Sequence, residues 1–157
     1  MNYGYIDKKC IVEKAKKICE CLGNGKYETA VEMIIETAVA ETGLGKIEDK
    51  TVGAGMGLTQ FDKLPFEDIK RRNMKLREKI LKELGVDLQL VEWEHLRYND
   101  FLALLFTRLF YLLKGDPIPK TIEERAAYWK LHYNTKLGKG TIEHYLEMNR
   151  RYGVEIE

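Results

Sequence analysis

Residues 27–43 read YETAVEMIIETAVAETG, and this stretch decides the fold that we predict. Apolar residues recur in it at the spacing of one side of an α-helix, and the glycines that follow are typical of a helix end. The apolar residues on that side are Tyr27, Ala30, Val31, Ile34 and Ala38. The pattern therefore predicts a helix from about Tyr27 to Glu41 or Thr42, with one side packed against a core.

Glu41 falls in the middle of that apolar side when successive residues are placed about 100° apart. Glu28, Glu32 and Glu36 fall on the opposite side, where we expect ordinary solvated side chains. A buried carboxylate is costly unless it is paired or protonated. Partial burial also raises the pKa of a carboxylic acid, as general acid catalysis near neutral pH requires. Glu41 is therefore a candidate catalytic acid; the alternative is a frayed helix end with this side chain in water.

Residues 51–61, TVGAGMGLTQF, differ in character from the helix before them. Three glycines stand at alternate positions, and glycine permits unusual backbone angles and the close approach of other groups. We expect a loop or a small irregular β element here.

The rest of the chain predicts further helices, over about residues 6–21, 65–84, 88–94, 99–115, 121–133 and 141–153. Asn99 and Thr141 suit helix N-caps, and Thr121 with Glu124 has the form of a capping box. The sequence contains no repeat or linker, and a length of 157 residues suits one compact core. We therefore predict a mainly α fold with a single domain over residues 1–157.

The composition is that of an ordinary globular protein, and a formal net charge of +1 gives no global field for holding nucleic acid. The one basic stretch, residues 70–79 (KRRNMKLREK), could attract nucleic acid or anionic wall polymers. A solvated helix face is the preferred interpretation, since acidic residues at helical spacing can pair with it. These acids are Glu67, Asp68, Glu78 and Glu83.

Nothing in the sequence indicates a metal or a cofactor. Cys10, Cys19 and Cys21 lie near one end, without a second pair for zinc, so we expect reduced, structural thiols. The three histidines have no ligand spacing, and the absence of serine excludes a serine nucleophile. The N-terminus has no apolar run typical of a signal peptide, and the apolar stretch 101–113 is too short to span a bilayer.

Three segments resemble, in the same order, motifs of the soluble lytic transglycosylase and goose-type lysozyme superfamily. They are residues 40–44 (AETGL), 53–60 (GAGMGLTQ) and 133–141 (YNTKLGKGT). The family pattern has Glu-Ser at a helix end, then Gly-Ala-x-Gly-Leu-Met-Gln, then Ala-Tyr-Asn-Ala-Gly-x-Gly. This chain has Thr42 in place of serine, Thr59 in place of methionine, one extra residue before Gln60, and Lys136-Leu137 in place of a tighter turn. Residues 60–62 (QFD) and 127–135 (AYWKLHYNT) are also similar to segments of lysozyme-like proteins of tailed phages and prophages.

The resemblance implies a lysozyme-like fold in which the glycine-rich loop lines a cleft, and an enzyme that cleaves peptidoglycan glycan strands. Glu41 would protonate the glycosidic oxygen and then act as a base. Gln60 would bond a sugar substituent, while Tyr133 and Asn134 would orient Glu41 or the substrate. The residues implied to contact the glycan are Thr42, Gly55, Met56, Gly57, Leu58, Gln60, Tyr133 and Asn134. The alternative for Tyr133 is a core aromatic at helical spacing from Trp129.

Hydrolysing glycosidases usually need a second carboxylate. Glu48, Asp49 and Asp62 are candidates by position, although solvated loop acids are the simpler interpretation. Lytic transglycosylases can use one acid, because the 6-hydroxyl of the substrate attacks, and the sequence favours this route. The alternatives are a hydrolase acting on the same bond and a non-catalytic glycan-binding or structural component of a virion.

The implied partners are peptidoglycan strands and other virion proteins, with no nucleic acid and no insertion into a membrane. We expect synthesis in the cytoplasm and action at the bacterial cell wall or in the periplasm. Carriage in a virion or escape through a holin would deliver the protein.

Overall fold

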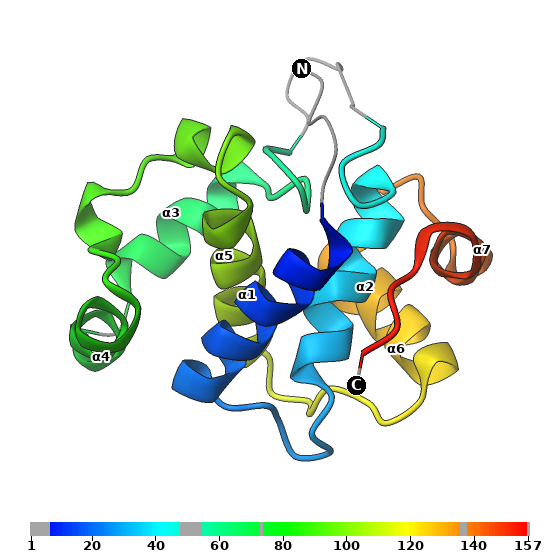
Figure 1. Ribbon diagram of the computed structural model, residues 1–157, viewed down its shortest axis with the longest axis horizontal. Helices are drawn as coiled ribbons and strands as arrows, with labels where there is room; N and C mark the ends of the chain where they lie inside the picture. Colours follow the sequence, from blue (N-terminus) through cyan, green and yellow to red (C-terminus); the bar gives the residue numbers. More distant parts are fainter. Residues whose placement is uncertain (1–6, 48–54, 73, 136–137, 157) are drawn as a thin grey trace.

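Two buried helices, α2 (Ala30–Thr42) and α5 (Asp100–Leu112), run through the centre of the molecule (Figure 1). The structure is a computed structural model, and it describes residues 7–47, 55–72, 74–135 and 138–156. Within these residues it has seven α-helices and no strand. None of these helices is long and apolar enough to cross a membrane.

Helix α5 begins where the sequence predicts, because the side chain of Asn99 accepts a hydrogen bond from the Leu102 amide at 3.0 Å. Every residue from Leu102 to Leu109 is buried. One of them is charged: the Arg108 guanidinium donates twice to the Gly23 carbonyl, at 3.0 and 2.8 Å. This contact satisfies a buried cation with the free carbonyl that follows helix α1 (Lys8–Leu22).

Helix α2 differs from its prediction in two ways. It begins at Ala30, because the Asn24 side chain accepts from the Val31 amide at 2.9 Å, and Tyr27 lies before it, 42% exposed. Its opposite face is also buried, because α1, α5 and α7 (Ile142–Tyr152) all contact it. The prediction that Glu36 is solvated is therefore wrong.

Glu36 is 8% exposed and forms a two-bond ion pair with Arg125 of helix α6 (Ile122–Trp129), at 2.8 Å for each bond. The Tyr145 hydroxyl donates to the same carboxylate at 2.7 Å. A face that carries charge in the sequence is thus covered by partners that neutralise it.

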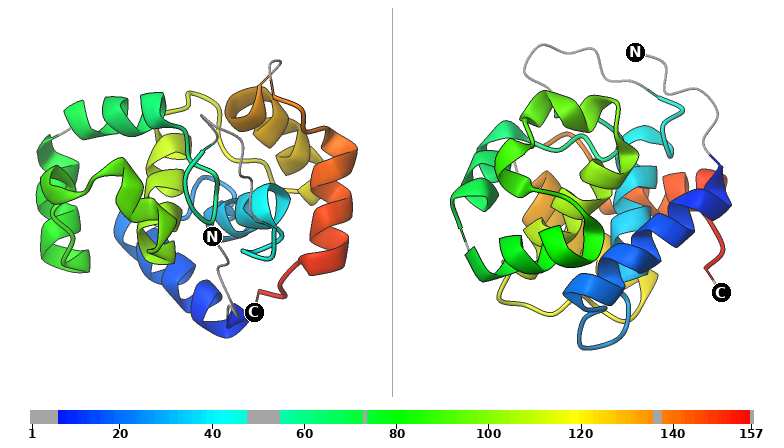
Figure 2. Two further views of the ribbon diagram at one scale, coloured as in Figure 1. Left: turned by 90° about the horizontal axis from the view of Figure 1, so that it is seen from above. Right: turned by 60° about the vertical axis from the view of Figure 1, so that its left-hand side comes forward.

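Helix α1 packs against both central helices, and the other four helices flank this group on two sides (Figures 1 and 2). Helices α3 (Lys63–Arg71) and α4 (Met74–Leu84) lie on the left in Figure 1, and α6 and α7 lie on the right. The sequence predicted one helix over residues 65–84, but the chain becomes extended at Arg72 and divides it. The short helix predicted over 88–94 is instead two 3-10 turns, η1 (Leu88–Leu90) and η2 (Trp93–Arg97), because Asp87 and Glu92 each cap a new turn.

The predicted caps of the last two helices are confirmed. Thr121 accepts from the Glu124 amide at 3.3 Å, and Thr141 accepts from the His144 amide at 3.0 Å. Helix α6 does not continue regularly to Tyr133, however. Its last turn is a π-helix, η3 (Lys130–Asn134), closed by a 2.8 Å bond from the Thr135 amide to the Lys130 carbonyl.

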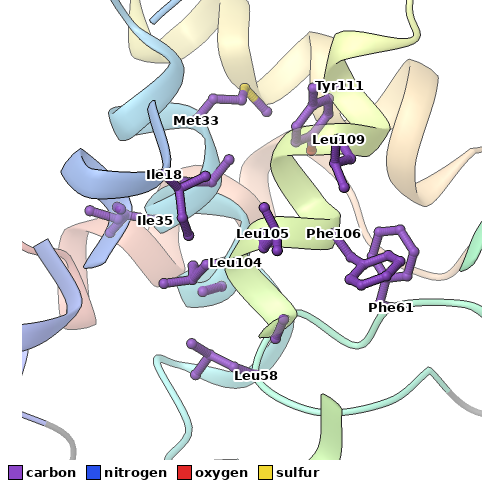
Figure 3. Packing of buried hydrophobic residues seen from close by; sticks show 14 of the residues in the cluster. Ile18, Met33, Ile35, Leu58, Phe61, Leu104, Leu105, Phe106, Leu109 and Tyr111 are labelled. Carbon is purple, nitrogen blue, oxygen red and sulfur yellow. The ribbon is translucent and has the colours of Figure 1, made fainter. Parts of the chain in front are cut away.

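The core lies between α1, α2 and α5, and the glycine-rich segment closes one side of it (Figure 3). Leu58 and Phe61 of that segment are buried, and the Phe61 ring meets the Phe106 ring of α5 at 6.0 Å between centroids. The core therefore fixes the segment that the sequence placed beside Glu41.

The three cysteines are free, as predicted, but only Cys19 and Cys21 are buried; Cys10 is exposed. Burial raises the pKa of the Cys19 thiol to about 11. The basic stretch is paired at two of the predicted places. Asp68 contacts the Arg72 guanidinium at 3.0 Å, and Glu83 contacts Lys79 at 4.0 Å. These contacts are typical of a solvated helix face.

Candidate active site around Glu41

Glu41 lies in the last turn of α2, where Gly43 ends the helix in the left-handed conformation at φ 59°. The side chain is half-buried. The indole N–H of Trp129 donates to its Oε2 at 3.0 Å, and the Trp129 side chain itself is buried. A carboxyl group at this place is thus held by a neighbouring helix instead of moving freely in water.

The glycine-rich segment forms a tight turn next to this helix end. Met56 and Phe61 exchange two backbone hydrogen bonds, at 2.9 and 3.0 Å, in an antiparallel β-bridge. Gly57 and Gln60 between them have positive φ values, 76° and 47°. The predicted loop or small irregular β element is confirmed over residues 55–61. Gly53, the first of the three alternate glycines, lies outside the described residues.

Two of the glycines are required by the protein's own backbone. A Cβ at Gly55 would overlap the Gln60 carbonyl, and a Cβ at Gly57 would overlap the Leu96 carbonyl of η2. A role of this loop in lining a glycan cleft is therefore not needed to explain these two glycines. Close packing of the turn on η2 explains both.

Hydrogen bonds join all three motif segments. Thr42 donates to the Leu58 carbonyl at 2.7 Å, and the Tyr133 hydroxyl donates to the Thr59 carbonyl at 2.6 Å. From α5, Thr107 donates to the Thr59 hydroxyl at 2.8 Å. The end of α2, the glycine-rich turn and the end of α6 thus meet in space, although they are far apart in the sequence.

The predicted contact residues differ in what they present. The side chains of Thr42 and Leu58 are 0% and 2% exposed, so they position the turn instead of facing a ligand. Met56 and Gln60 are half-buried. The Gln60 amide nitrogen donates to the Gly57 carbonyl at 2.9 Å, whereas its buried Oε1 accepts no hydrogen bond within the described part of the chain. A buried acceptor of this kind calls for a partner such as water or a ligand.

Tyr133 packs among aromatic rings, at 5.2 Å from Phe110 and 5.7 Å from Tyr111 between centroids. Desolvation raises the pKa of its hydroxyl well above the ordinary value, and the negative charge of Glu41 raises it further. The Tyr133 phenol therefore lies close enough to Glu41 for the charge of that carboxylate to affect its pKa. Tyr133 is thus a core aromatic near Glu41, and its role in orienting Glu41 or the substrate stays a prediction.

Asn134 supports the loop that follows. Its Oδ1 accepts from the Lys130 ammonium at 2.8 Å, and the same ammonium donates to the Gly138 carbonyl at 3.0 Å. Gly140 lies against both Trp129 and Asn134, where a side chain would collide with the indole ring. The third motif thus holds its own turn against the residue that contacts Glu41.

Three further residues contact this site, although no motif in the sequence assigns them to it. Trp129 enters the sequence argument only through its helical spacing from Tyr133, and that spacing is the signal that places the two residues on the same helix face. Thr107 gave no signal. His144, which has no ligand spacing in the sequence, contacts the last turn of α2 through a 3.0 Å bond between its Nε2 and the Ala40 carbonyl.

Asp62 is the second acid near this site. It directly precedes α3, and desolvation raises the pKa of its carboxyl group. Its charge also contributes to the raised pKa of the Tyr133 hydroxyl. The other candidates, Glu48 and Asp49, lie outside the described residues. Among the described residues, no three histidine, cysteine or acidic side chains gather as a metal site.

Comparison of this chain with protein-family models, with curated proteins and with solved structures finds no match.

Proposed function

We propose that this protein is a lysozyme-like peptidoglycan glycosidase that uses Glu41 as its catalytic acid. It cleaves the β-1,4 bond between N-acetylmuramic acid and N-acetylglucosamine by the lytic transglycosylase route. The observation that supports this most is the junction of the three motif segments around one half-buried carboxyl group. Their order along the chain is the order of the motifs that the sequence resembles.

The chemistry needs one group that gives and then takes a proton. The protonated Glu41 carboxyl gives its proton to the leaving glycosidic oxygen as the bond to C1 breaks. The carboxylate then accepts the proton of the 6-hydroxyl as that oxygen bonds to C1, which yields an anhydro sugar. The reaction consumes no water and needs no second carboxylate.

Asp62 supports a second candidate, a hydrolase acting on the same bond. A hydrolase requires a second carboxyl group to activate water or to stabilise the intermediate. The negative charges of Asp62 and Glu41 both raise the pKa of the Tyr133 hydroxyl, so both acids lie near that group. The product distinguishes the two routes, because water at C1 leaves a reducing sugar.

Mass spectrometry of digested, purified peptidoglycan tests the proposal. Anhydro-muramic ends are expected; reducing ends would assign the hydrolase, and intact sacculi would favour a non-catalytic glycan-binding or structural role in a virion. Glu41→Gln keeps the shape but cannot donate a proton, so the rate should fall about 100-fold or more. The matched control is Glu20→Gln on the exposed face of α1, which should keep full activity. Equal rates for the two variants would remove Glu41 as the acid.

A further inference from the structure

Two polar contacts join α6 to α2 one helical turn apart. Arg125 and Trp129 are four residues apart, so they lie on the same face of α6. Arg125 donates twice to Glu36, at 2.8 Å each, and Trp129 donates to Glu41 at 3.0 Å. The two contacts fix the rotation of α6 relative to the helix that carries the proposed catalytic acid.

Helix α7 supports both contacts from behind. The Tyr145 hydroxyl donates to Glu36 at 2.7 Å, while its ring packs against the Trp129 indole at 5.2 Å between centroids. Trp129 is 1% exposed and Tyr145 is fully buried. The indole therefore has no space to turn away from Glu41, and its N–H direction is set by three helices.

We propose that Trp129 is a positioning residue for Glu41, and that the Glu36–Arg125–Tyr145 cluster keeps its indole N–H directed at Oε2 of that carboxyl group. This inference rests on the proposed function for its catalytic meaning, but the contact can be tested without any substrate.

The chemistry of the indole gives the contact a direction. An indole N–H only donates, so Oε2 serves as the acceptor in either protonation state. The proton of the acid form is then favoured on Oε1, and the carboxyl group presents its acidic oxygen in one orientation. A donor to the charged form also favours ionisation, which opposes the effect of desolvation. Trp129 thus contributes to both the orientation and the acid strength of the Glu41 carboxyl group.

Other ionisable groups lie near this carboxyl group, and the test must distinguish their ionisation from that of Glu41. Tyr111 and Tyr133 have hydroxyl pKa values well above the ordinary value, chiefly through desolvation, and so stay neutral through the acidic and neutral range. His144 contacts the neighbouring Ala40 carbonyl through its Nε2 at 3.0 Å. The Glu36–Arg125 pair lies one turn away, and Asp62, whose carboxyl pKa is raised by desolvation, is the second acid near this site.

Tryptophan fluorescence tests the contact directly. The chain has two tryptophans, so one substitution isolates the emission of Trp129. Trp93→Phe leaves Trp129 as the single indole, and its emission is recorded from about pH 3 to pH 9. We expect one transition as Glu41 ionises. Adding Glu41→Gln should abolish the transition, whereas adding His144→Gln or Glu20→Gln should leave it. A transition that survives Glu41→Gln, or no transition in the single-tryptophan protein, would overturn the inference whatever the protein's activity.

Rate profiles then separate positioning from mere packing. Trp129→Phe keeps an aromatic ring but removes the donor, so the Glu41 pKa should rise and the alkaline limb of the rate profile should move to higher pH. We expect kcat to fall about tenfold with little change in KM. The matched control Trp93→Phe removes an indole N–H that donates to the Phe61 carbonyl at 2.8 Å, and it should not move the limb. A uniform loss of rate without a moved limb would mean a structural role only. If Glu41→Gln still abolishes activity in that case, the proposed function stands and only the positioning role of Trp129 fails.

Discussion

Removal of one partner from the buried ion pair between Glu36 and Arg125 should greatly lower the free energy of unfolding. Arg125→Met removes the partner and leaves a carboxylate that is 8% exposed. An unpaired buried charge costs about 3–5 kcal/mol of unfolding free energy. Urea denaturation followed by circular dichroism measures this change. A loss below about 1 kcal/mol would show that Glu36 escapes to water or is protonated easily.

The matched control for that variant is Arg150→Met. Arg150 also forms a two-bond pair, with Glu147 at 2.9 and 2.6 Å, but both side chains are more than half exposed. Exposed pairs contribute little because water screens them. The control should unfold at the same urea concentration as the unchanged protein.

The same pair shows what could not be predicted at the level of residues. Charge patterning placed Glu36 on a solvated face, since its neighbours along the helix give no sign of a partner. The partner stands 89 positions away, on a helix whose rotation is set by tertiary packing. Glu41 was placed correctly at a half-buried helix end, because its helix end is marked locally by Gly43.

The glycine-rich turn makes the second prediction, which concerns a structural element. Gly57→Ala must adopt a φ of 76° and must also push its Cβ into the Leu96 carbonyl. Gly85→Ala is the matched control: its φ is 70°, and a Cβ there meets nothing within 4 Å. The control should cost about 1–2 kcal/mol, the conformational term alone.

We expect Gly57→Ala to cost clearly more than Gly85→Ala, because η2 must move or the β-bridge must open. The comparison is made by thermal or urea unfolding of both variants side by side. Equal losses would mean that the turn is free to shift, and that the close approach to η2 does not hold the turn in place.

Helices were predicted well wherever their ends are set by local contacts. Asn99, Thr121 and Thr141 each bond a backbone amide three residues ahead, so a short sequence pattern contains the whole interaction. The break at Arg72 and the π-helical turn after Trp129 have no such local pattern. The contact between Trp129 and Glu41 follows from the packing of α6 on α2. The helical spacing places Trp129 on the same face as Tyr133, but it does not identify the partner on α2.

The third prediction concerns the stability of the complete protein at high pH. Tyr111 and Tyr145 are buried, and desolvation holds the pKa of each hydroxyl well above the ordinary value. Above about pH 10 the tyrosines of the unfolded chain lose their protons while these two keep theirs. Their contribution to stability is therefore complete below pH 10 and is lost as the pH rises further.

Each of these phenols lowers the unfolding free energy by about 1.4 kcal/mol per pH unit in that range. Urea midpoints measured between about pH 8 and pH 11.5 should be flat at first and then fall steeply. Tyr111→Phe should make the fall shallower, whereas Tyr98→Phe, at a position 76% exposed, should not. Unchanged midpoints up to pH 11.5 would contradict the burial of both hydroxyls.

The cluster of Glu36, Arg125 and Tyr145 also has a consequence for how the protein responds to temperature. Water solvates charged groups less favourably as it warms, so the cost of burying an ion pair falls on heating. Apolar packing follows the same trend, because it also weakens on cooling. The junction of α2, α6 and α7 contains both kinds of contact, so each of its components becomes less favourable in the cold. Cold should therefore loosen the orientation of Trp129 over Glu41 while the backbone of the helices is still folded.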